Sequence, residues 1–295
     1  MSALSDVARN LACPICSRSM TEDGGSLACA TGHSFDIARQ GYAGLVTGAG
    51  SRISDTAAMV GARDEFLTAG HYAPIADAVV NVLREAPQPD GVRRKPVDCP
   101  PDAHRGSFVI DLAGGTGYYA ARVMEAIPGG HGLVVDLSKY ALRRAARVHG
   151  RVAAVAADVW NSVPVRDGAA SAVLSIFGPR NPAEIARVLA PDGVLVVVTP
   201  TDRHLSELRS SLGLMAVDSR KAERLAAQLA IFEAGSAREI EYRVELSHAD
   251  VFTAAMMGPN AFHRDPGEVR TRVAELPAPF PVTVSVSVRT FRRAE

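Results

Sequence analysis

Residues 107–119 have the sequence SFVIDLAGGTGYY, in which a short apolar run leads directly into a glycine-rich turn. Glycine lets the backbone turn sharply and approach a ligand closely. If the run is a strand and a helix begins after Gly117, the free N–H groups of that helix face whatever binds at the turn. The stretch therefore predicts the first strand, the ligand-binding turn and the first helix of an α/β domain.

Short apolar runs alternate with helical patterns from residue 107 onward. Four more runs, GLVVDL, VAAVAAD, AASAVLSIF and GVLVVVTP, are separated by helical patterns at 119–126, 140–148 and 182–189. This alternation is typical of a mostly parallel sheet covered on both faces. A long helical stretch is expected at 203–235. The closing run VTVSVSVRTF predicts a strand with one face exposed to solvent.

Three carboxylates fall at the ends of the predicted strands. Asp111 lies in the first strand, Asp136 ends the second and Asp158 ends the third. Ligands of such sheets bind at the carboxyl ends of the strands. At these positions Asp136 is suited to accept hydrogen bonds from both hydroxyls of a ribose, and Asp158 to reach the edge of an adenine.

Two cofactor classes use this layout. Residues 115–120, GTGYYA, satisfy the dinucleotide pattern with alanine in the last position, so a nicotinamide cofactor is one candidate. Asp111 argues against it, because a carboxylate beside a pyrophosphate is unfavourable. S-adenosylmethionine carries a sulfonium and an ammonium and no phosphate, so it suits that carboxylate. The sequence predicts a Rossmann-like methyltransferase sheet that binds S-adenosylmethionine around Asp111, Gly115, Gly117, Asp136 and Asp158.

A second motif lies near the N-terminus, where Cys13, Cys16, Cys29 and His33 form a C-x₂-C…C-x₃-H pattern. This spacing is typical of a tetrahedral zinc site built on two turns. Four cysteines in 295 residues do not make a disulfide framework. A reducing, cytoplasmic location with thiolate–metal ligation fits better.

The bulk properties exclude some classes and leave others open. No apolar run is long enough for a membrane span, and the N-terminus lacks the pattern of a secretory signal. Lys+Arg and Asp+Glu both number 32. This balance gives no support to nucleic-acid binding and slightly favours a small-molecule substrate. Three regions are expected: a zinc-binding module at 1–50, a helical segment with a Pro-rich linker at 51–106, and the methyltransferase domain at 107–295. Residues 47–51 are expected to be a flexible connection.

The loop after the fourth predicted strand is the candidate substrate site. Phe177 is placed to stack on a base and Pro179 to shape the wall, although a core residue and a simple helix start explain them equally well. Arg180 is a candidate to stabilise negative charge on the acceptor. Trp160 either lines the adenine pocket or caps the sheet. No cysteine lies near these strand ends, which argues against a covalent route to pyrimidine carbon-5 and favours a nitrogen or oxygen acceptor.

The chain resembles the RlmA family of ribosomal RNA guanine-N1 methyltransferases nearly end to end. The resemblance is carried by CPIC…C…GHSFDIARQGY, GARDEFLTAGHYAP, DLAGGTGYY and TPTDRHL, in that order. AADVW, FGPRNPAEI and KAERLAAQL resemble the tylosin-resistance, or TlrB-type, branch, although Gly178 stands where alanine is expected. The linker around Cys99 is also longer than expected.

The resemblance implies zinc on the Cys₃His set and cofactor contacts from Tyr72, Gly117, Tyr118 and His204. It implies a guanine in a hairpin loop of domain II of 23S rRNA as substrate, RNA recognition by the zinc-binding module at 1–50, and a contribution to macrolide resistance. The alternatives are a small-molecule methyltransferase and a non-catalytic zinc-containing RNA-binding protein. A homodimer is a further expectation.

Overall fold

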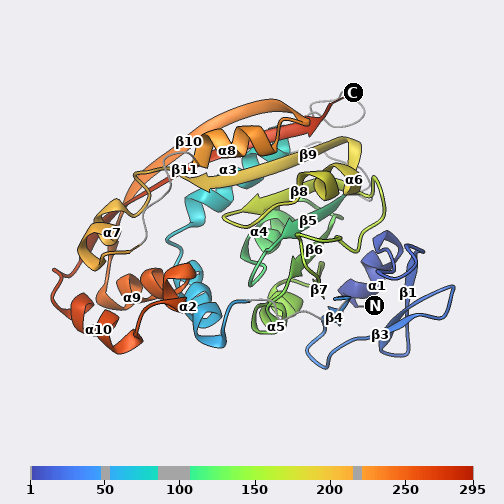
Figure 1. Cartoon of the computed structure of the whole chain (residues 1–295), viewed down its shortest axis with the longest axis horizontal. Helices are drawn as coiled ribbons and strands as arrows, with labels where there is room; N and C mark the ends of the chain where they lie inside the picture. The colour runs from blue at the N-terminus through green and yellow to red at the C-terminus, as the bar shows by residue number, and fades with distance from the viewer. Residues whose placement is uncertain (1, 48–53, 86–106, 215–220, 295) are drawn as a thin grey trace.

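The computed structural model describes residues 2–47, 54–85, 107–214 and 221–294. Its centre is an eight-stranded sheet with helices on both faces (Figure 1). The predicted linker at 87–106, with Cys99, lies outside the described residues, as does the predicted connection at 47–51 apart from residue 47. None of the described helices is both long and apolar enough to cross a membrane.

The central sheet has the order β10-β11-β9-β8-β5-β6-β7-β4. Its parallel strands are β4 (Ala43–Gly44), β5 (Phe108–Leu112), β6 (His131–Asp136), β7 (Val152–Ala156), β8 (Ala170–Ile176) and β9 (Leu189–Pro200). The antiparallel pair β10 (Phe232–Leu246) and β11 (Phe280–Arg293) completes one edge. The mostly parallel sheet predicted from the sequence is confirmed, and its strand order reverses direction beside β5, where ligands of such sheets bind.

Residues along the inner strands alternate between two hydrophobic cores, as the two-residue period of a strand requires. Val109 and Val134 belong to one core, while Ile110 and Val135 belong to the other. The first core is covered by α3 (Ala73–Glu85), α4 (Tyr118–Ala126) and α5 (Lys139–Val148). The second is covered by α1 (Ala3–Val7), α6 (Pro182–Val188) and α8 (Lys221–Gln228).

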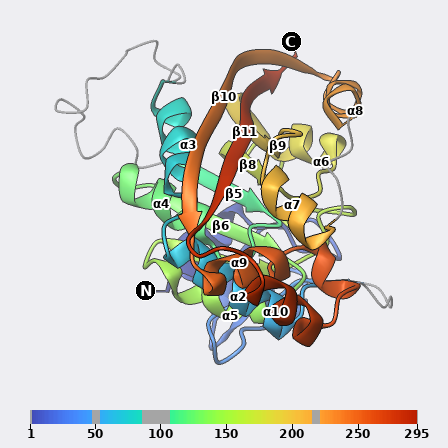
Figure 2. The same ribbon diagram turned by 90° about the vertical axis from the view of Figure 1, so that its left-hand side faces the viewer.

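A separate group of helices lies beside the carboxyl ends of the parallel strands. It consists of α2 (Ala57–Thr68), α9 (His248–Met256) and α10 (Pro266–Ala274), with α7 (Ser206–Leu212) nearby (Figures 1 and 2). Thr56 caps the N-terminus of α2, where its side chain accepts a hydrogen bond from the Met59 backbone N–H. Helix α9 begins with a capping box between Ser247 and Asp250. The helical segment expected within 51–106 is confirmed, and it consists of α2 and α3 with a break at Gly70, which is in the left-handed conformation.

The N-terminal residues fold into a small module against the second core. It contains the 3₁₀ helix η1 (Ala8–Asn10) and an antiparallel sheet of β1 (Met20–Asp23), β2 (Ser26–Cys29) and β3 (Ser34–Asp36). Leu11, Met20 and Leu27 are fully buried in the same cluster as Val135 and Val155 of the large sheet. Strand β4 then joins the large sheet beside β7. The metal module and the methyltransferase sheet therefore share both a core and a sheet edge.

Two expectations for the C-terminal part are wrong. The long helix expected at 203–235 is replaced by α7, which Gly213 ends in the left-handed conformation, by α8, and by β10, which begins at Phe232. Helix-favouring residues in β10 are overridden by pairing with β11. Strand β11 also lacks the wet face expected near its start, because Thr283 and Ser285 are buried beneath the loop that follows β9.

Candidate active site and metal centre

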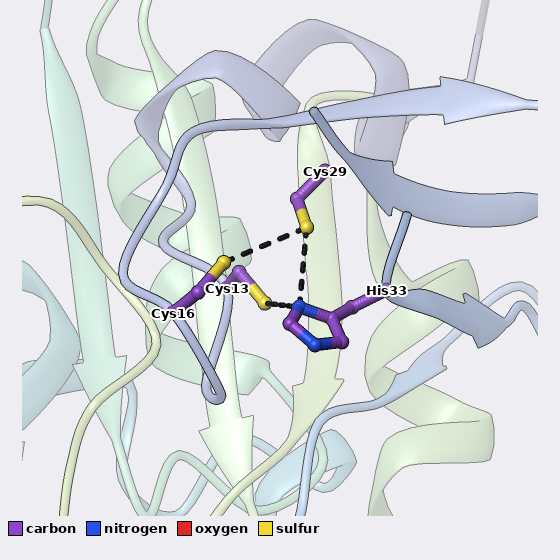
Figure 3. A group of neighbouring side chains, drawn as sticks. All are labelled: Cys13, Cys16, Cys29 and His33. Carbon is purple, nitrogen blue, oxygen red and sulfur yellow. Dashed lines mark hydrogen bonds between the residues drawn. The ribbon is translucent and has the colours of Figure 1, made fainter. Parts of the chain in front are cut away.

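Cys13, Cys16, Cys29 and His33 converge at one point of the N-terminal module (Figure 3). Nδ1 of His33 lies 3.6 Å from Sγ of Cys13 and 3.5 Å from Sγ of Cys29, and the Cys16 and Cys29 sulfurs are 3.6 Å apart. A tetrahedral zinc with Zn–S of about 2.3 Å and Zn–N of about 2.0 Å places two sulfurs about 3.8 Å apart and a sulfur about 3.5 Å from a nitrogen. The four atoms therefore fit a zinc ion, with His33 ligating through Nδ1.

The surroundings of the cluster favour thiolates. The Thr31 hydroxyl lies 3.0 Å from Sγ of both Cys16 and Cys29, and its hydrogen bond lowers the pKa of Cys29 to about 5. The same hydroxyl lowers the pKa of Cys16, while burial raises that of Cys13. Hydrogen bonds from the imidazole to the Cys16 and Cys29 sulfurs raise the pKa of His33. Zinc needs deprotonated cysteines, so Thr31 supports the ligands through the outer shell.

A cavity of about 700 Å³ opens at the carboxyl ends of β5, β6, β7 and β8. The helical group closes its other side with Arg63 and Leu67 of α2, Tyr72 just before α3, and residues 257–259 after α9. Thus residues that precede position 86 and residues that follow position 106 line one chamber. A cavity of this size in this place is the default ligand site of such a sheet.

The glycine-rich turn has the backbone conformation that the sequence predicts. Gly115 and Gly117 have φ of +57° and +81°, and Gly117 is the N-cap of α4. A Cβ on Gly117 would lie 3.0 Å from Cγ1 of Val148 and 3.2 Å from the Cα of Ala145. Both the left-handed backbone and the close packing of α4 on α5 therefore require glycine here.

Two buried polar groups beside this turn are left without a hydrogen-bond partner among the described residues. They are Oδ2 of Asp111, whose residue is 1% exposed, and the hydroxyl of Tyr119. Burial, with a smaller effect of Asp136, raises the pKa of Asp111 to about 7. Both residues line the cavity. A buried acid and a buried hydroxyl of this kind fit a ligand with a positive charge and hydrogen-bonding groups, as the methionine end of S-adenosylmethionine offers.

Asp136 is engaged by the backbone around it. One carboxylate oxygen accepts from the Gly115 N–H at 2.9 Å and the other from the Ser138 N–H at 2.7 Å. Burial raises its pKa, and the nearby Asp55 carboxylate adds to this effect. Each oxygen has further lone pairs, so Asp136 can fix the glycine turn and still accept from a ligand hydroxyl.

Asp158 shapes the turn after β7. Its oxygens accept from the Trp160 N–H at 3.0 Å and from Nδ2 of Asn161 at 3.2 Å. The carbonyl of Trp160 accepts in turn from Nδ2 of Asn181 at 2.9 Å. This leaves the Trp160 indole at the cavity rim with 58% of the residue exposed. The expectation that Trp160 caps the sheet does not agree with this exposure.

The loop after β8 combines one exposed and one buried predicted residue. Phe177 is 38% exposed, has φ of +55° and lines the cavity together with Pro179. Phe177 is therefore a cavity residue and not a core residue. Arg180 is buried and turns inward, where Nε donates to Oγ of Ser175 at 3.3 Å and a terminal nitrogen donates to the Gly178 carbonyl at 3.2 Å. In this structure Arg180 braces the loop and is not among the residues that line the cavity.

Tyr72 and His204 meet in the cavity although they are 132 residues apart. The Tyr72 hydroxyl lies 2.9 Å from Nε2 of His204, and both rings lie within 6 Å of the Phe177 ring, centroid to centroid. Tyr118, at the start of α4, lines the same cavity. The structure thus gathers the predicted cofactor residues around one chamber, except that Gly117, at the N-cap of α4, is not among the residues that line it. The roles of the individual residues remain predictions.

The cavity residues that sequence reasoning missed include Arg63 and Tyr119. Arg63 forms an ion pair with Asp55 and donates to the Met257 carbonyl at 2.7 Å, so it ties α2 to the end of α9. It also lies beside Gly115. Arg63 stands within the GARDEFLTAGHYAP motif. The place of this motif in the order of the family's motifs was the only feature of the sequence that pointed to Arg63. Tyr119 follows Tyr118 directly, but nothing in the sequence distinguishes it from a core residue.

Two family models match the chain. The RlmA N-terminal zinc-ribbon model matches residues 11–47, and a methyltransferase-domain model matches residues 109–193. A 23S rRNA (guanine(748)-N(1))-methyltransferase of Streptomyces fradiae is 42% identical over 288 residues, 97% of this chain and 98% of its own. A protein of Micromonospora griseorubida is 42% identical over 297 residues, with the same coverage. The YxjB protein of Bacillus subtilis (strain 168) is 30% identical over 206 residues, 68% of this chain and 67% of its own.

Proposed function

Because this chain belongs to the RlmA-type family of 23S rRNA (guanine-N1)-methyltransferases, we propose that it methylates N1 of a guanine in 23S rRNA. The observation that carries the proposal is end-to-end similarity at 42% identity to the Streptomyces fradiae enzyme, which spans both the zinc ribbon and the cavity. The cofactor of this fold is S-adenosylmethionine, which supplies an electrophilic methyl group when bound, and the module holds zinc.

One part of the cavity is assigned to the methyl donor and another to the guanine. The side of the cavity lined by Asp111, Gly115, Asp136 and Asp158 holds the methyl donor, and Gly117 sets the backbone turn behind it. The Phe177–Pro179 loop receives the guanine, because it lines the same cavity and exposes an aromatic ring there. Guanine is a flat base that must leave its stack to enter such a chamber, and an exposed ring can stack on it there. The buried walls exclude water and hold donor and acceptor in line.

The zinc module is proposed to contact the RNA from a fixed position. Strand β4 and the shared core attach it to the catalytic sheet, so it has no need of independent motion. Its outer surface exposes Ile15, Arg18 and Arg39. Removing zinc with a chelator, and measuring RNA affinity and cofactor affinity separately, tests this role. A loss of RNA affinity alone supports direct contact between the module and the RNA. An equal loss of RNA affinity and cofactor affinity would show that zinc has a purely structural role.

The finer substrate is proposed to be a guanine in a hairpin loop of domain II, with a contribution to macrolide resistance. Mass mapping of methylated nucleotides in 23S rRNA from a deletion strain tests the reaction and the position together. Complementation with the wild-type chain is expected to restore the methyl group. Restored methylation without any change in tylosin susceptibility would separate the reaction from the resistance.

Two glycine variants make a matched pair for this complementation. Gly117 and Gly168 both have positive φ, so alanine strains the backbone at either site. A Cβ on Gly117 meets Val148 and Ala145, whereas one on Gly168 meets nothing within 4 Å. Gly117→Ala is expected to abolish methylation and Gly168→Ala to preserve it.

An unmodified guanine N1 in the wild-type strain would refute the proposed function.

The remaining expectations stay predictions that follow from this substrate. A ribosomal RNA substrate places the protein in the cytoplasm. Homodimer formation is tested by light scattering on the purified protein. Methylation of a small molecule in the absence of RNA would instead support the alternative substrate class, and RNA binding without cofactor binding would support a non-catalytic role.

A further inference from the structure

The charged residues of helix α5 are all positive, and three of them form one exposed row. The helix sequence, KYALRRAARV, holds one lysine and three arginines and no acidic residue. Lys139, Arg143 and Arg147 are exposed at positions i, i+4 and i+8, so they follow one another along one face; we call them the basic row. The opposite face is buried through Leu142 and Ala145. Like charges at this spacing repel one another and destabilise a helix, so the row does not serve the stability of α5.

The basic row differs from the C-terminal basic cluster in its partners. Within the described part of the chain, no carboxylate forms an ion pair with any of the three cations of the row. Arg144, which lies beside the row on α5, pairs instead with Asp64 of α2 at 2.9 Å. In the C-terminal cluster, Arg292 and Arg293 both donate to backbone carbonyls. The charge of the basic row is thus available to a partner outside the chain.

Tyr140 holds two members of the row in place. The ammonium nitrogen of Lys139 lies 5.3 Å from the centre of the Tyr140 ring, and the guanidinium carbon of Arg143 lies 5.7 Å from it. A cation–π contact keeps a long side chain near one position without cancelling its charge. Two cations are therefore positioned in advance, and less conformational entropy is lost when they bind an anion.

The basic row connects the zinc module to the cavity. Figure 1 shows α5 between α2 and the strands of the module. At one end, Lys139 comes two residues after Leu137, which lines the cavity. At the other end, a Cβ on Gly41 of the module would lie 3.6 Å from Cβ of Ala146, and the turn that contains Gly41 exposes Arg39. The eight helical residues between the first and last cation span about 12 Å. A cationic path therefore runs from the module across α5 to the cavity.

We propose that the basic row of α5 binds the sugar–phosphate backbone of the rRNA strand next to the target guanine, between the zinc module and the cavity. This assignment rests on the proposed function. The formal net charge of the chain is zero, so attraction of an RNA strand must come from a local surface such as this row. Lysine and arginine bind phosphate whatever the base, so the row supplies affinity and register and leaves selection of the base to other parts of the protein.

The salt dependence of RNA binding tests this assignment. The probe is a hairpin transcript from domain II of 23S rRNA, and the triple variant Lys139→Gln, Arg143→Gln and Arg147→Gln removes the charges but keeps good helix formers. Each phosphate contact on a single strand contributes about 0.7 to the slope of log affinity against log salt. We expect the slope to become shallower by about 2 and the affinity at about 0.1 M salt to fall by about 10²-fold. The affinity for S-adenosylhomocysteine and kcat at saturating RNA are expected to stay within about twofold of wild type.

Single variants separate the charge from the packing and from the position of the side chain. Arg143→Gln is expected to make the slope shallower by about 0.7, whereas Arg143→Lys keeps the charge and is expected to keep the slope. Arg243→Gln is the matched control, because it removes an exposed arginine from β10, at the opposite edge of the central sheet from α5. It is expected to leave the slope unchanged. Zinc content and circular dichroism confirm that each variant is folded.

Three results would overturn the inference. The first is a triple variant with the salt slope of the wild type. The second is an equal change of slope in Arg143→Gln and Arg243→Gln, since only the overall charge would then matter. The third is a triple variant that binds the hairpin normally but fails on assembled ribosomal subunits, which would assign the row to a ribosomal protein. A wild-type protein that neither binds nor methylates the hairpin would overturn the proposed function as well, whereas an active wild type with a fully active triple variant overturns this inference alone.

Discussion

The shared core predicts that the zinc module and the catalytic sheet unfold together, and Leu27→Ala tests this directly. Leu27 is fully buried in β2, two residues before the ligand Cys29, and belongs to the cluster that contains Val135 and Val155. Replacing a buried leucine by alanine costs about 2–5 kcal/mol because it removes apolar contacts and leaves a cavity. At about 3 kcal/mol the ratio of unfolded to folded protein rises roughly 10²-fold.

The assay follows two signals during denaturation of the full chain. Far-ultraviolet circular dichroism reports the large sheet, and a coloured chelator reports zinc release. In the wild type the two transitions are expected to coincide, and in Leu27→Ala both are expected to move together to lower denaturant. Ile15→Ala is the matched control, because Ile15 lies in the same module but is 59% exposed. Its effect on stability is expected to stay within about 0.5 kcal/mol.

One outcome would refute the reasoning. If Leu27→Ala advances zinc release and leaves the transition of the sheet in place, the module is an independent unit. The burial of Leu11, Met20 and Leu27 would then belong to the module alone.

Three further predictions concern the cavity. The pKa of Asp111 is about 7 before the donor binds, so donor affinity is expected to fall about tenfold for each pH unit below 7. In calorimetry, Asp111→Asn is expected to remove this dependence on pH. A dependence that survives in the variant would point to another titrating group. In Gly178→Ala the new Cβ would lie 3.1 Å from Cβ of Ala113, so a cost below about 1.5 kcal/mol is expected in thermal unfolding, and a larger one would show that the loop cannot give way. Arg180→Met removes the bonds that brace Ser175 and the loop, so KM for the RNA is expected to rise several-fold at unchanged cofactor affinity; an unchanged KM in steady-state kinetics would exclude the bracing role.

Local patterns predicted the parts of this molecule that depend on few residues. The parallel strands follow from buried apolar runs, and the turn at Gly115 and Gly117 follows from the need for positive φ. The metal site is equally local, because the C-x₂-C and C-x₃-H spacings determine its geometry. These features could be predicted from the sequence because each depends on residues that are close together along the chain.

The rest depends on contacts between distant segments, which a single sequence does not reveal. Strand β4 has only two residues and shows no periodicity, so its pairing with β7 could not be predicted from the sequence. The start of β10 has helix-favouring residues, and only its partner β11 makes it a strand. The inward turn of Arg180 and the orientation of the His204 ring depend on Ser175 and Ser285. For the same reason the sequence suggested Tyr72 only through resemblance.

The pairing of β4 with β7 has a consequence for the order of folding during synthesis. Residues 43–44 emerge from the ribosome about 110 residues before their partners at 155–156. The zinc module can therefore bind its metal early, while its apolar face stays exposed until β7, the third strand of the Rossmann-like domain, has been synthesised. Such a late, long-range pairing is entropically slow and leaves a nascent intermediate that is prone to aggregate. A truncated N-terminal piece should thus need a solubilising partner even when its metal is in place.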